Sequence, residues 1–177
     1  MADRPVTIDD VNTLDRDAFV ARFGSLFEGS PWIAAEAWSS RPFASRGGLH
    51  QALCAVVENA PAEQQIALIQ AHPDLVGSAA LSGTLGRHST AEQAAAGLDP
   101  DRLSAAEVAT FSELNRAYRE RFGFPFVICA RENKKVGILA GFATRLQHSR
   151  GEEIAVALGE IAKICHYRLI EAMPEDD

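Results

Sequence analysis

Apolar residues recur at intervals of three and four along nearly the whole chain. One such set lies near the N-terminus (Phe19, Val20, Phe23, Leu26, Phe27) and another near the C-terminus (Ile154, Leu158, Ile161, Cys165, Leu169). These intervals place the members of a set on one face of a helix, whereas a strand requires strict alternation. The pattern predicts an all-α protein, a single-domain compact helical bundle of about eight helices that occupies residues 1–177.

Polar residues mark where several of these helices begin and end. Asp15 is suited to cap a helix start, and Pro61 suits the first position of a helix that stops at His72–Pro73. Ser104 and Glu107 have capping-box spacing and open a helix that we expect to end at Gly123.

Two stretches interrupt the helical pattern. Residues 75–88 are rich in glycine and serine, which predicts a loop. Residues 124–130 are apolar and partly β-branched, so they form either a strand or an extended buried segment. Two further helices are predicted at 133–149 and 152–172.

Composition and charge narrow the classes of function. The chain has 47% hydrophobic and 23% charged residues, values ordinary for a soluble globular domain. Its net charge of -7 argues against a nucleic-acid partner, and an anionic ligand would need locally placed cations. The three cysteines (Cys54, Cys129, Cys165) lie in apolar runs, which indicates a reducing compartment rather than a disulfide framework.

We expect a cytoplasmic protein with no membrane partner. The N-terminus opens no apolar segment, and no run is long enough to span a bilayer. The last residues are not a Ser-Lys-Leu-type peroxisomal address.

Two short motifs carry groups suited to proton transfer. His72-Pro73-Asp74-Leu75 places an imidazole where a proline ends a helix, and Ser89-x-x-Glu92-Gln93 places a carboxylate and an amide where another begins. Such an acid–base pair can perform proton chemistry without a metal. Structural interpretations stay open, because His72 can cap its helix C-terminus and Ser89 with Glu92 can form a capping box.

Two further features suit ligand binding. Arg168 lies beside the apolar stripe of the last helix, so its guanidinium requires a partner, either a protein carboxylate or a bound anion. An extended Phe126-Val127-Ile128 would present backbone N–H and C=O groups that can read the edge of a polar ring.

Other classes of function predict different arrangements. A metal-dependent hydrolase acting on a ureide would bring His72, Asp74 and His88 together, although their spacing matches no usual metal motif. A cysteine nucleophile, Cys129 or Cys165, would lie in apolar surroundings. A non-catalytic helical interaction module would scatter the polar groups over the surface.

The motifs occur in the same order as in a known protein family. The chain resembles the 2-oxo-4-hydroxy-4-carboxy-5-ureidoimidazoline (OHCU) decarboxylases, which act in urate degradation, from about Phe19 to Leu169. The resemblance rests on the two motifs above, on Leu114-Asn115-x-x-Tyr118-x-x-x-Phe122-Gly123-Phe124-Pro125-Phe126-Val127, and on Ile161-x-x-Ile164-x-x-x-Arg168-Leu169.

The resemblance implies an all-helical homodimer that uses no cofactor and no metal. It implies decarboxylation of a small anionic ureide, OHCU, to (S)-allantoin, with His72 and Glu92 as the catalytic residues. The residues that it implies for substrate binding are Pro73, Ser89, Gln93, Phe126, Val127, Ile128 and Arg168.

Overall fold

The computed structural model describes residues 6–174 and contains no β-strand among them. The all-α prediction is therefore confirmed, with ten α-helices in the described residues instead of about eight. The chain divides into two compact units, residues 1–68 with 165–177 (unit 1) and residues 69–164 (unit 2). That the chain forms a single domain stays a prediction.

Unit 1 contains the first helices of the chain and the last turns of its longest helix. Its elements are α1 (Ile8–Thr13), α2 (Arg16–Phe23), α3 (Trp32–Ala37), α4 (Arg46–Asn59), α5 (Ala62–Gln70) as far as residue 68, and α10 (Arg150–Ala172) from residue 165. Two 3-10 turns, Gly24–Leu26 and Trp38–Ser40, follow α2 and α3.

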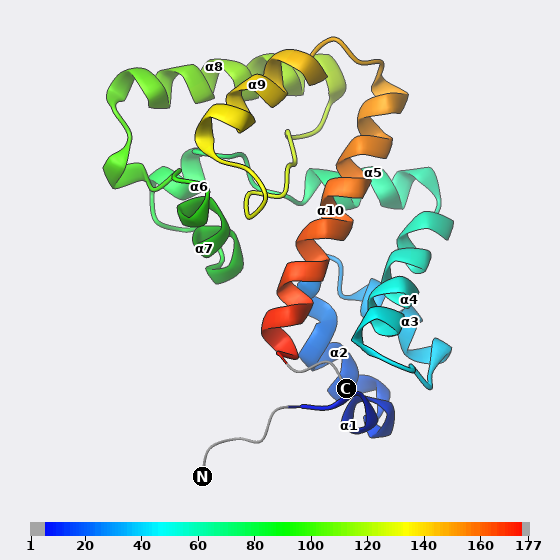
Figure 1. Ribbon diagram of the computed structural model, residues 1–177. Helices are drawn as coiled ribbons and strands as arrows, with labels where there is room; N and C mark the ends of the chain where they lie inside the picture. The colour runs from blue at the N-terminus through cyan, green and yellow to red at the C-terminus, as the bar shows by residue number, and fades with distance from the viewer. Residues whose placement is uncertain (1–5, 175–177) are drawn as a thin grey trace. The chain divides into compact units, whose positions relative to one another are not determined.

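The core of unit 1 forms where α3 packs on both α2 and α4 (Figure 1). Phe19 lies fully buried, with its ring centroid 4.9 Å from that of Phe23 and 6.0 Å from that of Phe43. Asp15 caps α2 as predicted, since its side chain accepts a hydrogen bond from the Ala18 N–H.

Unit 2 contains α6 (Ser78–Leu81), α7 (Arg87–Ala95), α8 (Ala105–Phe122), α9 (Lys135–Arg145) and α10 as far as residue 164. The predicted capping box of Ser104 and Glu107 opens α8. Gly123 ends α8 with a φ of 81°, a left-handed conformation that favours glycine.

The stretch predicted as a loop at 75–88 contains more helix than expected. It includes α6 and the first residues of α7, which raises the number of helices. One glycine of this stretch, Gly77, is required by the packing, because an added Cβ would lie 2.7 Å from Cβ of Asp74. The chain therefore needs glycine for this close approach.

Aromatic rings form the core of unit 2. Figure 1 shows α9 alongside α8, and the Phe142 ring of α9 contacts the α8 rings of Phe111 and Tyr118. Phe126 stacks on Phe142, with centroids 3.8 Å apart. Residues 124–130 thus form the buried segment without strand pairing, the second of the two alternatives expected for them.

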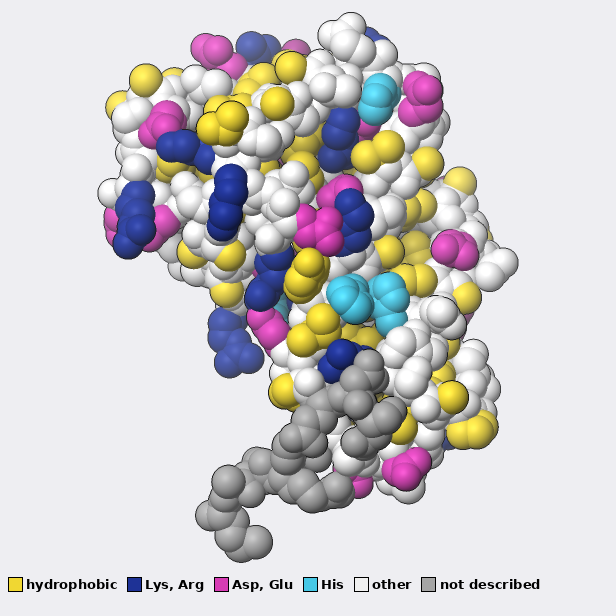
Figure 2. Space-filling view, viewed as in Figure 1, with side chains coloured by type: hydrophobic (Ala, Val, Ile, Leu, Met, Phe, Trp, Pro, Cys, Tyr) yellow, Lys and Arg dark blue, Asp and Glu magenta, His cyan; other side chains and the backbone are white. Residues whose placement is uncertain are grey.

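Charged side chains of both signs are interspersed over the face displayed in Figure 2. Within residues 6–174, every helix is too short or too polar to cross a bilayer. The two chain ends, which supported the expectation of a cytoplasmic protein, lie partly outside the described residues.

Candidate functional site

His72 lies immediately beyond the C-terminus of α5, as the following proline predicts. Its backbone N–H donates to the Ile69 carbonyl at 3.2 Å, which closes the last turn before Pro73. The residue is only 6% exposed. An imidazole is thus buried at the point where the chain leaves the helix.

The loop after Pro73 is attached to α7 through Gln93. The side-chain oxygen of Gln93 accepts from the Val76 N–H at 3.0 Å, and its amide nitrogen donates to the Asp74 carbonyl at 3.3 Å. Val76 has a φ of 51°, which is unfavourable for a β-branched residue. The Gln93 amide therefore holds a strained turn close to His72.

The same loop is attached to α8 by Asn115 and Arg119, neither of which was predicted as a site residue. Asn115 donates its amide N–H to the Leu75 carbonyl at 2.8 Å. Arg119 donates from Nε to both carboxylate oxygens of Asp74, at 2.9 and 3.1 Å. Because α7 and α8 both bind the loop, the position of His72 is set by two helices besides its own.

Ser89, Glu92 and Gln93 lie buried on one face of α7. Their spacing of three and four residues brings them to the same side of the helix. The helix begins at Arg87 with Gly86 as its N-cap, so the capping-box interpretation of Ser89 and Glu92 is wrong. A glutamate that is 8% exposed is unusual in a soluble protein, where carboxylates are mostly solvated.

The C-terminal end of α7 is bound to the start of α9. Lys134 donates from Nζ to the Ala95 carbonyl at 2.6 Å, and the Lys135 N–H donates to the Ala96 carbonyl at 3.1 Å. These bonds satisfy carbonyls that a helix end leaves open. The two lysines thus hold the helix that carries Ser89, Glu92 and Gln93.

The backbone of residues 126–128 is also fixed by neighbouring side chains. The Val127 carbonyl accepts from Nη1 of Arg145 at 2.7 Å, and the Cys129 N–H donates to Oε2 of Glu160 at 2.7 Å. Phe126 and Val127 are buried, and Ile128 is half-buried.

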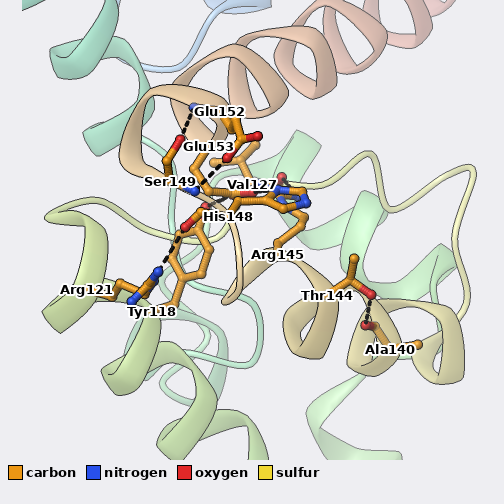
Figure 3. Close-up of polar contacts among 10 residues, drawn as sticks. All are labelled: Tyr118, Arg121, Val127, Ala140, Thr144, Arg145, His148, Ser149, Glu152 and Glu153. Atoms are coloured by element: carbon orange, nitrogen blue, oxygen red, sulfur yellow. Dashed lines mark hydrogen bonds and ion pairs between the residues drawn. The ribbon is translucent and has the colours of Figure 1, made fainter.

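A buried polar network surrounds Arg145 (Figure 3). Glu153, which is 0% exposed, accepts from Nε of Arg145 at 2.9 Å and from the Tyr118 hydroxyl. Its other oxygen lies 2.7 Å from Nδ1 of His148. Burial, and then the bond to Glu153, raises the pKa of the Tyr118 hydroxyl above its usual value, so it remains a donor.

Sequence reasoning missed this network, although one signal was available. Arg145 continues the apolar stripe of α9 that contains Ile138 and Phe142. It thus occupies a position like that of Arg168, which sequence reasoning did single out.

Arg168 lies in the part of α10 that belongs to unit 1 and is 2% exposed. Its Nη1 donates to Oε2 of Glu28 at 3.2 Å and to the Leu26 carbonyl at 3.3 Å. Of the two expected kinds of partner, the structure supplies the protein carboxylate. The substrate-binding role that the resemblance implies for Arg168 stays a prediction.

The alternative chemistries find less support. No group of three or more His, Cys, Asp or Glu within residues 6–174 is arranged to hold a metal ion, so His72, Asp74 and His88 do not converge. Burial raises the pKa of the Cys129 and Cys165 thiols, which disfavours a thiolate nucleophile. The polar groups of an interaction module would be exposed, whereas His72, Glu92 and Arg168 are buried.

Comparison with known proteins yields consistent matches. The sequence model of the family described as OHCU decarboxylase matches residues 12–170. A protein of Haloferax volcanii named 2-oxo-4-hydroxy-4-carboxy-5-ureidoimidazoline decarboxylase is 43% identical over 166 residues, which cover 94% of this chain and 95% of that protein. A protein of Amia calva with the same name is 42% identical over 159 residues, 90% of each chain.

A solved structure also matches. The crystal structure of (S)-allantoin synthase superposes with a TM-score of 0.73 at 29% identity, covering 96% of this chain and 54% of that chain.

Proposed function

Because this chain belongs to the OHCU decarboxylase family, we propose that it decarboxylates 2-oxo-4-hydroxy-4-carboxy-5-ureidoimidazoline to (S)-allantoin in urate degradation. The observation that carries this proposal is the family match over residues 12–170, which contains every residue of the candidate site. The burial of His72 and Glu92 supports it further, since it suits chemistry that must exclude water.

The substrate can undergo this reaction with few protein groups. The carbon that loses CO2 carries the hydroxyl and neighbours the C=N bond of the ring. As the C–CO2 bond breaks, its electron pair forms a C=C bond, and the C=N π pair moves to the nitrogen, which takes up a proton. The resulting enol gives up its O–H proton while the adjacent carbon gains one, which yields allantoin.

The proposed roles of His72 and Glu92 follow from the proton movements. His72 accepts the hydroxyl proton or delivers the new C–H proton, because an imidazole exchanges protons near neutral pH. Glu92 hydrogen-bonds the ring and keeps His72 in its working state. Delivery of the carbon-bound proton from one side produces a single enantiomer.

The remaining predicted residues bind the substrate in this proposal. Ser89, with the backbone of Phe126, Val127 and Ile128, contacts the polar edge of the ring. Arg168 binds a carboxylate or ureido oxygen with its guanidinium, which offsets the net charge of -7.

Two residues near His72 have structural contacts that add to their proposed role. Gln93 contributes to substrate binding and also holds the loop at Asp74 and Val76. Pro73 fixes the chain direction after His72.

We also propose a homodimer, which the resemblance implies, and a cytoplasmic location. Sedimentation equilibrium of the purified protein tests the oligomeric state directly. A molar mass of twice 19.1 kDa supports the homodimer, and 19.1 kDa contradicts it.

The activity can be tested on substrate generated in place. Urate treated with uricase and hydroxyisourate hydrolase produces OHCU, whose ultraviolet absorbance decays slowly by itself. The proposal expects this protein to accelerate the decay in proportion to its concentration, also after treatment with a chelator. Decay at the spontaneous rate, with native helical content verified by circular dichroism, would reject the activity.

A further inference from the structure

The segment proposed to bind the substrate is anchored at two backbone groups. The Val127 carbonyl accepts from Arg145, and the Cys129 N–H donates to Glu160. Pro125 favours an extended conformation in the residue before it and has a fixed φ itself. Both anchored groups belong to a short stretch of chain that forms neither a helix nor a strand.

The two anchors also determine which way the neighbouring backbone N–H and C=O groups face. Residues i and i+2 direct their N–H and C=O groups to the same edge, and the residue between them directs its own to the opposite edge. Side chains from α9 and α10 bind the Val127 carbonyl and the Cys129 N–H, two groups that an extended chain directs to one edge. The same alternation directs the backbone groups of Ile128, and those of Phe126, to the other edge.

Arg145 also contacts the side chain of this segment. Its guanidinium carbon lies 4.2 Å from the centroid of the Phe126 ring, which also stacks on Phe142 and meets the Tyr118 ring edge-on. One arginine thus touches the backbone at Val127 and the ring at Phe126. Both contacts limit how far the segment can rotate.

The guanidinium itself is held in place by the buried network of Figure 3. Glu153 accepts from Nε of Arg145 at 2.9 Å, and Nη2 of Arg145 donates to the Tyr118 hydroxyl at 3.3 Å. Arginine is suited to this task because its planar fork donates in several fixed directions, which a lysine ammonium cannot reproduce.

We propose that Arg145, oriented by Glu153 and Tyr118, is a positioning residue that presents the Phe126–Ile128 backbone to the substrate. The inference rests on the proposed function for the identity of that ligand. Arg145 is not a catalytic residue, since it acts on the substrate only through the backbone that it holds.

The test compares two arginine-to-lysine variants. Arg145→Lys retains the charge opposite Glu153 but loses the forked geometry that reaches the Val127 carbonyl. Arg150→Lys is the matched control, because Arg150 also donates to a backbone carbonyl, that of Phe122, and its guanidinium carbon lies 5.7 Å from the Phe124 ring. The control therefore removes the same kind of contact five residues upstream.

We expect Arg145→Lys to raise KM for OHCU about tenfold, with a much smaller change in kcat, because the lost backbone position acts on substrate binding. Arg150→Lys should leave KM within about twofold of the unsubstituted protein. Equal KM values for Arg145→Lys and the unsubstituted protein, or an equal rise in the two variants, would overturn the proposal.

A second readout does not depend on the activity. Hydrogen–deuterium exchange of the peptide covering residues 124–130 should quicken in Arg145→Lys and stay unchanged in Arg150→Lys. If the unsubstituted protein lacks the activity, the proposed function fails while this measurement still decides the anchoring. Unchanged exchange in Arg145→Lys rejects the anchoring.

Tyr118→Phe provides an independent variant in case Arg145→Lys does not fold. It keeps the ring among its aromatic neighbours and removes only the hydroxyl that bonds Glu153 and Arg145. Faster exchange at residues 124–130 is expected here too. Exchange equal to that of the unsubstituted protein would contradict the role given to the network.

Discussion

The proposed catalytic residues, His72 and Glu92, place a buried imidazole and a buried carboxylate in unit 2. His72 leaves α5 at a proline, and Glu92 lies on the face of α7 that Gln93 joins to the loop after His72. Asn115 of α8 binds the loop that follows His72, and Lys134, the N-cap of α9, binds the end of α7. The hydrogen bonds named here for these attachments use neither the His72 nor the Glu92 side chain.

We expect His72→Asn and Glu92→Gln each to lower kcat by a factor of about 10² to 10⁴, the usual contribution of a positioned acid or base. The unfolding temperature of each variant should show whether the fold is retained. Steady-state kinetics on OHCU generated in place measures the effect. Near-normal turnover in either well-folded variant would remove that residue from the catalytic pair.

Arg168 requires a different design because its guanidinium is paired with the carboxylate of Glu28. Removing the guanidinium alone would leave the carboxylate of Glu28 beside the Leu26 carbonyl without its counter-charge. The reference is therefore the Glu28→Gln protein. Adding Arg168→Gln to it should raise KM for the anionic substrate about tenfold, as expected for loss of a charge-assisted hydrogen bond. A KM equal to that of Glu28→Gln would exclude Arg168 from substrate binding.

Sequence reasoning identified isolated residues better than it identified networks. Arg168 was conspicuous as a cation beside an apolar stripe, and the structure provides Glu28 as its partner. Arg145 had the same signature on a shorter helix, but its partners Glu153 and Tyr118 are 8 and 27 residues away. Spacing along a chain reports helix faces and does not report which faces meet.

Among the elements, long amphipathic helices were predicted well and short polar ones poorly. The start and end of α8 agree with the capping box and with Gly123. Helix α7 was not bounded correctly, because its buried face consists of Ser89, Glu92 and Gln93 rather than apolar residues. A helix whose buried face is polar has no apolar stripe to reveal its register.

The first turn of α8 yields a prediction about acid stability. A hydrogen bond from Lys135, and then the Ser104 N–H, lower the pKa of Glu107 below its usual 4.5. A carboxyl whose pKa is lowered in the folded state stabilises the fold at pH values above its unfolded-state pKa. This contribution disappears as pH falls through the folded-state pKa.

We therefore expect the unfolding temperature to depend less on pH in Glu107→Gln than in the unsubstituted protein once pH falls below about 4.5. At pH 7 the variant should be the less stable of the two. Glu113→Gln, an exposed carboxylate on the same helix, controls for the loss of one negative charge. Parallel pH profiles for Glu107→Gln and the unsubstituted protein would contradict this assignment.

For the molecule as a whole, the hydrophobic pattern predicted the all-α class but little of how the helices are arranged. Helical spacing over the chain correctly gives an all-α protein, and the order of four motifs agrees with the family that matches residues 12–170. The division into two units was not foreseen, since α5 and α10 each continue across it without any break in pattern. Continuous helices carry no local signal for where a compact unit ends.

The configuration of the product distinguishes the proposed enzymatic reaction from the spontaneous decay of OHCU. OHCU generated from urate should give (S)-allantoin in large excess when this protein is present, as measured by circular dichroism or chiral chromatography during the first minutes. Racemic allantoin formed in the presence of the folded protein would contradict the proposed function.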